Sequence, residues 1–74
     1  MDIKHLKTMG FTEETTPTGE KFLLQDMGEN RQTFGSRYEY RISFGSIDLS
    51  GSSNTLEEVY SDIQKYQAEF DTVA

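Results

Sequence analysis

The strongest constraint on the fold is a strict alternation of apolar and polar residues between positions 37 and 50. Even positions from 38 to 44 are apolar or aromatic and the odd ones are polar, which is the period of a strand with one buried face. The parity reverses after Gly45-Ser46, a pair suited to a type II′ turn because glycine tolerates a positive φ. Such a turn sets Phe44 opposite Ile47, so the stretch is predicted to be one β-hairpin.

The chain is predicted to open with a short helix and two strands. Asp2 is suited to cap a helix over residues 2–9, and Gly10 is suited to end it in a Schellman motif. Residues 12–16 are typical of an edge strand whose charges discourage pairing with other chains, and residues 21–27 of an inner strand. We expect the short helix to lie at an edge of the sheet or on the face that the C-terminal helix covers. The second face of the inner strand, expected to be partly exposed, carries Leu23 and Met27.

The C-terminal helix is predicted by a capping box and an apolar stripe. Thr55 and Glu58 have the spacing at which each side chain satisfies a free backbone N–H of the other residue. Apolar side chains then recur at intervals of three and four as far as Phe70, as expected of a helix that lies on a sheet. On the opposite side Glu58, Asp62 and Glu69 line up within a narrow arc, which is the largest acidic surface that the sequence predicts.

Together these elements predict one α+β domain over residues 1–74, in which a four-stranded antiparallel β-meander carries the C-terminal helix on one face. The order is α-β-β-β-β-α. Residues 28–36 are expected to form a polar loop, and residues 51–54 a flexible link before the last helix. The predicted core consists of Leu6, Phe22, Leu24, Tyr40, Ile42, Phe44, Ile47, Leu49, Leu56, Val59, Ile63 and Phe70.

Composition narrows the classes of function. The 74 residues have a net charge of −6 and include no cysteine, so disulfides and thiolate metal sites are excluded. The acidity argues against direct binding to nucleic acid or to a membrane surface, because both need clustered Lys and Arg. No apolar run is long enough for a membrane span, and the first residues lack the apolar segment of a signal peptide, so we expect a cytoplasmic protein.

No catalytic constellation is visible in the sequence. His5 is the only histidine, and no nucleophile motif, phosphate-binding loop or metal-ligand spacing accompanies it. The adjacent carboxylates Glu13-Glu14 and Glu57-Glu58 diverge, since neighbouring residues point to opposite faces of a strand and about 100° apart on a helix. The sequence therefore predicts a protein that is not an enzyme and that needs no metal or cofactor.

Residues 31–50 form the only segment that is not acidic. Arg37 and Arg41 are expected on the face of the hairpin that points away from the core, where they can bind a carboxylate or phosphate of a partner. Phe34, an isolated aromatic residue near Arg31 in the polar loop, either packs over the edge of the core or anchors a partner. The back of the hairpin and this loop are therefore a second candidate surface. If the three arginines meet anionic groups together, the alternative function is a binder of a small anionic ligand or nucleotide.

Three stretches give the chain the layout of a known class of small proteins. They are Leu6-Lys7-Thr8-Met9-Gly10-Phe11, Ile42-Ser43-Phe44-Gly45-Ser46-Ile47-Asp48-Leu49 and Thr55-Leu56-Glu57-Glu58-Val59. In size and layout the chain resembles the acidic, cysteine-free accessory proteins of bacteriophages and other mobile elements, some of which inhibit host defences such as CRISPR systems. The resemblance implies a non-enzymatic inhibitor of a host nucleic-acid-handling complex. Independently of the resemblance, the acidic helix face is expected to mimic phosphate and to bind a protein with a basic surface, and the open sheet face leaves a homodimer as an alternative.

Overall fold

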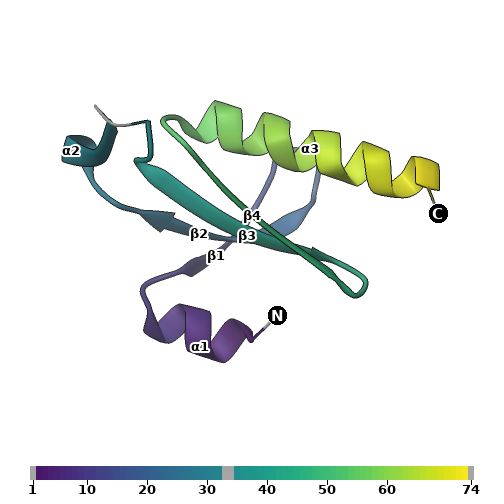
Figure 1. Cartoon of the computed structure of the whole chain (residues 1–74), viewed down its shortest axis with the longest axis horizontal. Coiled ribbons are helices and arrows are strands. Elements are labelled where there is room, and N and C mark those ends of the chain that lie inside the picture. Colours follow the sequence, from purple (N-terminus) through teal and green to yellow (C-terminus); the bar gives the residue numbers. More distant parts are fainter. Residues whose placement is uncertain (1, 33–34, 74) are drawn as a thin grey trace.

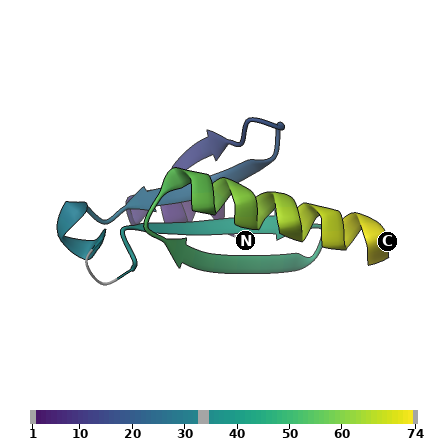
Figure 2. The same cartoon turned by 90° about the horizontal axis from the view of Figure 1, so that it is seen from above.

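The computed structural model describes residues 2–32 and 35–73 and contains one antiparallel sheet with helices on both of its faces (Figures 1 and 2). The elements in chain order are α1 (Ile3–Thr8), β1 (Thr12–Thr15), β2 (Lys21–Asp26), α2 (Glu29–Gln32), β3 (Tyr38–Phe44), β4 (Ile47–Ser53) and α3 (Leu56–Val73). The strand order is β1-β2-β3-β4, so the predicted α+β meander is confirmed. Among the described residues, no helix is both long and apolar enough to cross a membrane.

The β3–β4 hairpin has the predicted register. Phe44 pairs with Ile47, and Ile42 pairs with Leu49. Within the Gly45-Ser46 turn only the glycine has a positive φ, of 63°, as a type II′ turn requires. The alternation of apolar and polar residues was therefore sufficient to predict both the turn and the shared apolar face.

Strand β4 is longer than the sequence indicates. It continues to Ser53, so the flexible link expected over residues 51–54 is wrong for its first three positions. Gly51 pairs with Tyr40 of β3, and a Cβ added to the glycine would lie only 2.6 Å from Cζ of the tyrosine. The absence of a side chain at position 51 thus makes room for the buried ring of Tyr40. Hydrogen bonding with β3 keeps the Gly- and Ser-rich end of β4 in the strand conformation.

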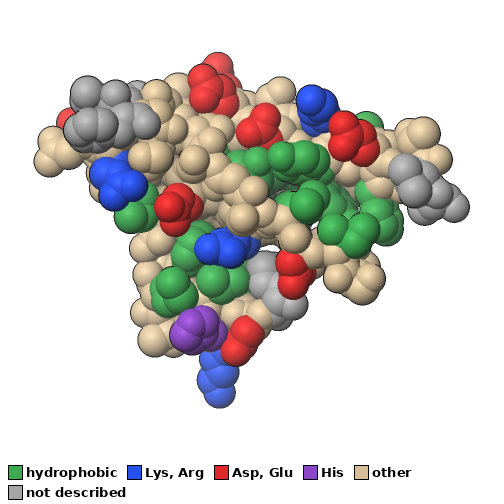
Figure 3. All heavy atoms as spheres, in the orientation of Figure 1, with side chains coloured by type: hydrophobic (Ala, Val, Ile, Leu, Met, Phe, Trp, Pro, Cys, Tyr) green, Lys and Arg blue, Asp and Glu red, His purple; other side chains and the backbone are tan. Residues whose placement is uncertain are grey.

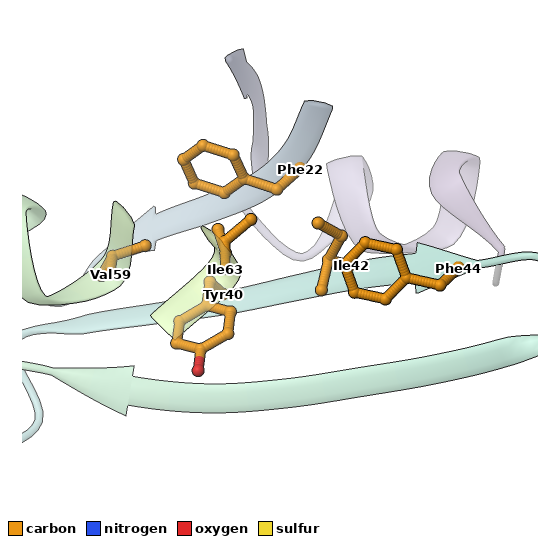
Figure 4. Close-up of a cluster of buried hydrophobic side chains, with 6 residues drawn as sticks. All are labelled: Phe22, Tyr40, Ile42, Phe44, Val59 and Ile63. Carbon is orange, nitrogen blue, oxygen red and sulfur yellow. The ribbon is translucent and has the colours of Figure 1, made fainter. Parts of the chain in front are cut away.

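The core lies between the sheet and α3. Edge-to-face packing joins Phe22 to Tyr60, with ring centroids 6.1 Å apart, and the rings of Phe44 and Phe70 stack at 5.6 Å. Partly buried neighbours, among them the predicted core residues Leu24, Leu49 and Phe70, pack around the centre. The buried centre, drawn in Figure 4, consists of Phe22, Tyr40, Ile42, Phe44, Val59 and Ile63.

Three residues predicted for the core belong neither to the buried centre nor to the partly buried neighbours packed around it. The side chain of Ile47 is 51% exposed, because β4 is an edge strand and its outer margin lies clear of α3 (Figure 2). Leu6 and Leu56 are only half-buried, the former on α1 and the latter in the first turn of α3. The apolar pattern gave the correct face for Ile47 but could not show how far the helix extends over it.

A second buried region lies on the opposite face of the sheet, where partial exposure of Leu23 was expected. Leu23 is 2% exposed and Phe11 is 3% exposed. Gln25, on the same face of β2 as Leu23, donates from Nε2 to the carbonyl oxygen of Met9 at 2.9 Å. Helix α1 therefore lies across the sheet from α3, and the expected positions at an edge or beside α3 are wrong (Figures 1 and 2).

The boundaries of α1 follow the predicted capping pattern. The Asp2 carboxylate accepts the backbone N–H of His5 at 3.1 Å. At the other end Gly10 has a φ of 105°, and the N–H of Phe11 donates to the carbonyl of Leu6 at 3.1 Å, as in a Schellman motif. This reversal of the chain brings Phe11 under the sheet.

Two local predictions differ from the structure in detail. Within the expected loop of residues 28–36, residues 29–32 form the one-turn helix α2. At the start of α3 the Thr55 hydroxyl accepts the N–H of Glu58 at 3.2 Å, as predicted. The Glu58 carboxylate, however, accepts the N–H of Asn54 at 3.3 Å, one residue before the expected cap.

Candidate partner-binding surface

Glu58, Asp62 and Glu69, here called the acidic flank, lie within about 40° of one another around α3. Their arc was expected opposite the apolar stripe, and the structure places it beside the stripe, since Asp62 is only about 40° from the half-buried Tyr66. Glu58 and Glu69 are exposed, whereas Asp62 is half-buried. Figure 3 shows acidic side chains in a row along α3.

Asp62 is held in place from the core. Its carboxylate accepts a hydrogen bond from the hydroxyl of Tyr40 at 3.2 Å, and the tyrosine is only 1% exposed. Burial, followed by hydrogen bonding with Tyr66 and the negative charge of Asp62, raises the pKa of Tyr40 above its ordinary value of 10.0. Because the phenol stays neutral at physiological pH, it remains a donor, and it fixes the carboxylate above Gly51 of β4.

The outer edge of β4 presents backbone groups to a partner. In a hairpin with a two-residue turn, the two residues that flank the turn, here Phe44 and Ile47, form a hydrogen-bonded pair. Hydrogen-bonded and non-hydrogen-bonded pairs alternate along an antiparallel ladder, so every second residue of β4 directs its N–H and C=O away from β3. Ser50 and Ser52 are two such residues. The described sheet ends at β4, and α3 lies over a face of the sheet and not along this edge (Figure 2).

An apolar strip separates this edge from the acidic flank. Figure 3 shows hydrophobic side chains in the band between α3 and the strands, beneath the acidic row. Ile47 is the most exposed residue of the strip, and the other members are partly buried. The edge of β4 and this strip are here called the β4 margin, and the strip consists of Ile47, Leu49, Tyr66 and Phe70.

The back of the hairpin, the second candidate surface, is partly covered by α1. The guanidinium carbon of Arg41 lies 5.9 Å from the ring centroid of Phe11. Arg41 also borders a hollow of about 250 Å³ that Asp2 and Asp48 line as well. The Ser43 hydroxyl donates to the Asp48 carboxylate and, as the first cause, lowers the pKa of that group. An anion at Arg41 would therefore meet two carboxylates.

The other arginines have separate neighbours. Nε of Arg37 lies 3.2 Å from Oδ1 of Asp26, and this hydrogen bond is the first cause that lowers the pKa of the Asp26 carboxyl. Arg31, on α2, donates from its guanidinium to the Ser36 hydroxyl at 3.4 Å. Phe34, the proposed anchor, lies outside the described residues. The three arginines of the ligand-binding hypothesis are thus held by different groups.

The sequence predicts the acidic flank on α3 but not the β4 margin. A signal was present, because the segment from Ile47 to Ser53 contains a single charged residue, Asp48, and no proline, which leaves an edge strand unprotected. Among residues 2–32 and 35–73, no three His, Asp or Glu side chains come together as a metal site. No protein-family model, curated protein or solved structure matches this chain.

Proposed function

We propose that this protein is a non-enzymatic interaction module that binds a protein with a basic surface through the acidic flank of α3. The observation that carries the proposal is the carboxylate of Asp62, which the buried Tyr40 hydroxyl fixes at 3.2 Å beside an open sheet edge. A fixed carboxylate loses less conformational entropy on binding than a free surface side chain does.

The charge of the whole chain supports this choice of partner. A net charge of −6 steers association toward basic surfaces, and a row of carboxylates can occupy a groove that otherwise binds phosphates. In line with the resemblance to accessory proteins of mobile elements, we propose an inhibitor of a nucleic-acid-handling complex of the host, acting in the cytoplasm. Such an inhibitor competes with nucleic acid for the same groove.

The test uses the whole chain as bait in a bacterial lysate at low salt, followed by purification of the captured protein and measurement of its affinity. Glu58→Gln/Asp62→Asn/Glu69→Gln removes the charges of the flank and keeps a hydrogen-bond acceptor for Tyr40 and for the Asn54 N–H. We expect this variant to bind at least about tenfold more weakly, with a flatter dependence on salt. Duplex DNA should displace the wild-type protein.

The matched control, Glu13→Gln/Glu14→Gln/Glu57→Gln, removes three charges outside the flank. It should retain most of the affinity, because the proposal depends on the position of the charges and not on their sum. Equal losses in the two variants, or capture of no basic protein, would contradict the proposed function.

A further inference from the structure

The outer edge of β4 offers a way of binding that the acidic flank alone does not define. We propose that β4 accepts an extended segment of the partner as a fifth strand, with basic side chains of that segment directed toward the acidic flank. This inference rests on the proposed function, since it specifies how the same basic partner is held. Strand addition is a recurrent mode of peptide recognition, in which the backbone supplies hydrogen bonds and alternate side chains supply specificity.

The backbone of β4 is suited to this role. The register of the hairpin directs the N–H and C=O groups of Ser50 and Ser52 out of the sheet. Strand β4 is seven residues long and pairs with β3 along its whole length without a bulge. An added strand could therefore form a regular ladder along it.

The negative charge of the chain favours a basic segment over a second copy of the protein at the edge of β4. If a second copy paired through β4 in antiparallel fashion, the two-fold axis would stand perpendicular to the joined sheet, and both α3 helices would lie on one face. The two acidic flanks would then face each other across the junction, between chains that each have a net charge of −6. A segment with Lys or Arg on that face replaces this repulsion with attraction.

Spacing defines the pattern of the segment further. Glu58 and Asp62 are four residues apart on α3, which is about 6 Å along the helix axis. Alternate residues of a strand are about 6.7 Å apart, so two basic residues separated by one position match the two carboxylates. Toward the hairpin turn the same face of the added strand meets Ile47 and Leu49, which favour an apolar residue.

The probe is a heptapeptide with blocked ends and the sequence Val-Thr-Lys-Thr-Lys-Thr-Val, which has the same pattern in both strand directions. Its control, Val-Lys-Thr-Thr-Thr-Lys-Val, has the same composition but places the lysines on the face opposite the valines. Each peptide is titrated into the nitrogen-15-labelled whole chain. We expect the probe to shift the amide signals of Ser50 and Ser52 and to slow their hydrogen exchange, and the control to do so at least fivefold more weakly.

A pair of variants tests the backbone contact. Ser50→Pro removes one outward N–H while leaving the pairing with β3 intact, because proline is tolerated at such positions of edge strands. Ser50→Thr keeps the N–H and serves as the matched control. The proline variant should bind the probe at least fivefold more weakly and the threonine variant should bind it normally. If Ser50→Pro does not fold, the exchange of the two serine amides in the wild-type chain decides the question.

The remaining outcomes distinguish strand addition at β4 from binding through the acidic flank. Shifts confined to α3, with Ser50 and Ser52 unchanged, would overturn strand addition and leave binding through the acidic flank standing. Equal binding of the control peptide, no binding of the probe, or pairing of two copies through β4 would also overturn the inference. If Glu58→Gln/Asp62→Asn/Glu69→Gln bound the probe as the wild type does and the Ser50 and Ser52 amides still shifted, strand addition would stand, and the role of the flank in both proposals would fail.

Discussion

The two edges of the sheet are built in opposite ways. β1 has four exposed residues, two of which are glutamates, and Glu13 forms an ion pair with Lys7 of α1 at 3.1 Å. β4 has seven residues and one charge, and an apolar strip lies beside it. Charges on an edge strand discourage pairing with other chains, whereas their absence permits it. By the number of charges, β1 is therefore the better protected of the two edges against intermolecular pairing.

The largest expected effect on stability tests whether apolar side chains are buried next to β1 and exposed at β4. Leu23→Ala should lower the free energy of unfolding by about 3 kcal/mol, because it leaves a cavity beneath α1. Ile47→Ala should cost less than about 1 kcal/mol, since half of that side chain is already in water. Denaturant unfolding of both variants measures the difference, and equal losses would refute the contrast between the edges.

The contrast between Leu23 and Ile47 also shows which parts of the fold can be predicted from the sequence. The hairpin and its register were predictable because the alternation and the two-residue turn are local features. The burial of Leu23 and Phe11 was not, because it depends on the face of the sheet that α1 covers, and a short helix with little apolar pattern does not specify that face. The extension of β4 to Ser53 was missed for a related reason, since Gly and Ser have low strand propensity and only pairing with β3 makes them a strand.

The candidate site was predictable to a similar degree. Spacing along α3 was enough to group Glu58, Asp62 and Glu69 on one arc. Spacing could not show that Tyr40 would reach Asp62, because that contact depends on the packing of the helix across the sheet. The charge pattern therefore predicts the flank but not the strand edge beside it.

A smaller effect on stability tests the hydrogen bond by which Tyr40 holds Asp62 of the acidic flank next to β4. Tyr40→Phe should destabilise the fold by about 1 kcal/mol, because it removes the hydrogen bond to Asp62. Since the folded-state pKa of Tyr40 lies above its ordinary value of 10.0, the wild type should also lose stability as the pH rises above 10, and the variant should lack this loss. Unfolding curves at several pH values check both expectations.

The control for this substitution is Tyr38→Phe, which removes a hydroxyl from a half-buried tyrosine two residues away on the same face of β3. It should change stability by less than about 0.5 kcal/mol. If the two variants behave alike at every pH, the bond between Tyr40 and Asp62 does not position the flank.

Only a small effect on folding is expected at the protected edge. Glu13→Val/Glu14→Val should change the free energy of unfolding by less than about 1 kcal/mol, because both positions are exposed. The variant should nevertheless self-associate at concentrations at which the wild type is monomeric, as sedimentation velocity would show. Glu57→Val/Asp71→Val makes the same change in charge and apolar surface on α3. Association of this control to the same extent would show that the glutamates of β1 do not act as edge protection.

The close approach of Tyr40 and Gly51 has a consequence for relatives of this protein. A side chain at position 51 and a large ring at position 40 cannot occupy the same space, so the two positions are expected to change together during divergence. A relative with alanine or serine at position 51 should carry a smaller residue at position 40, and it would then lack the phenol that holds the carboxylate at position 62. Aligned sequences would therefore separate members that keep the fixed acidic flank from members that have lost it, before any of them is purified.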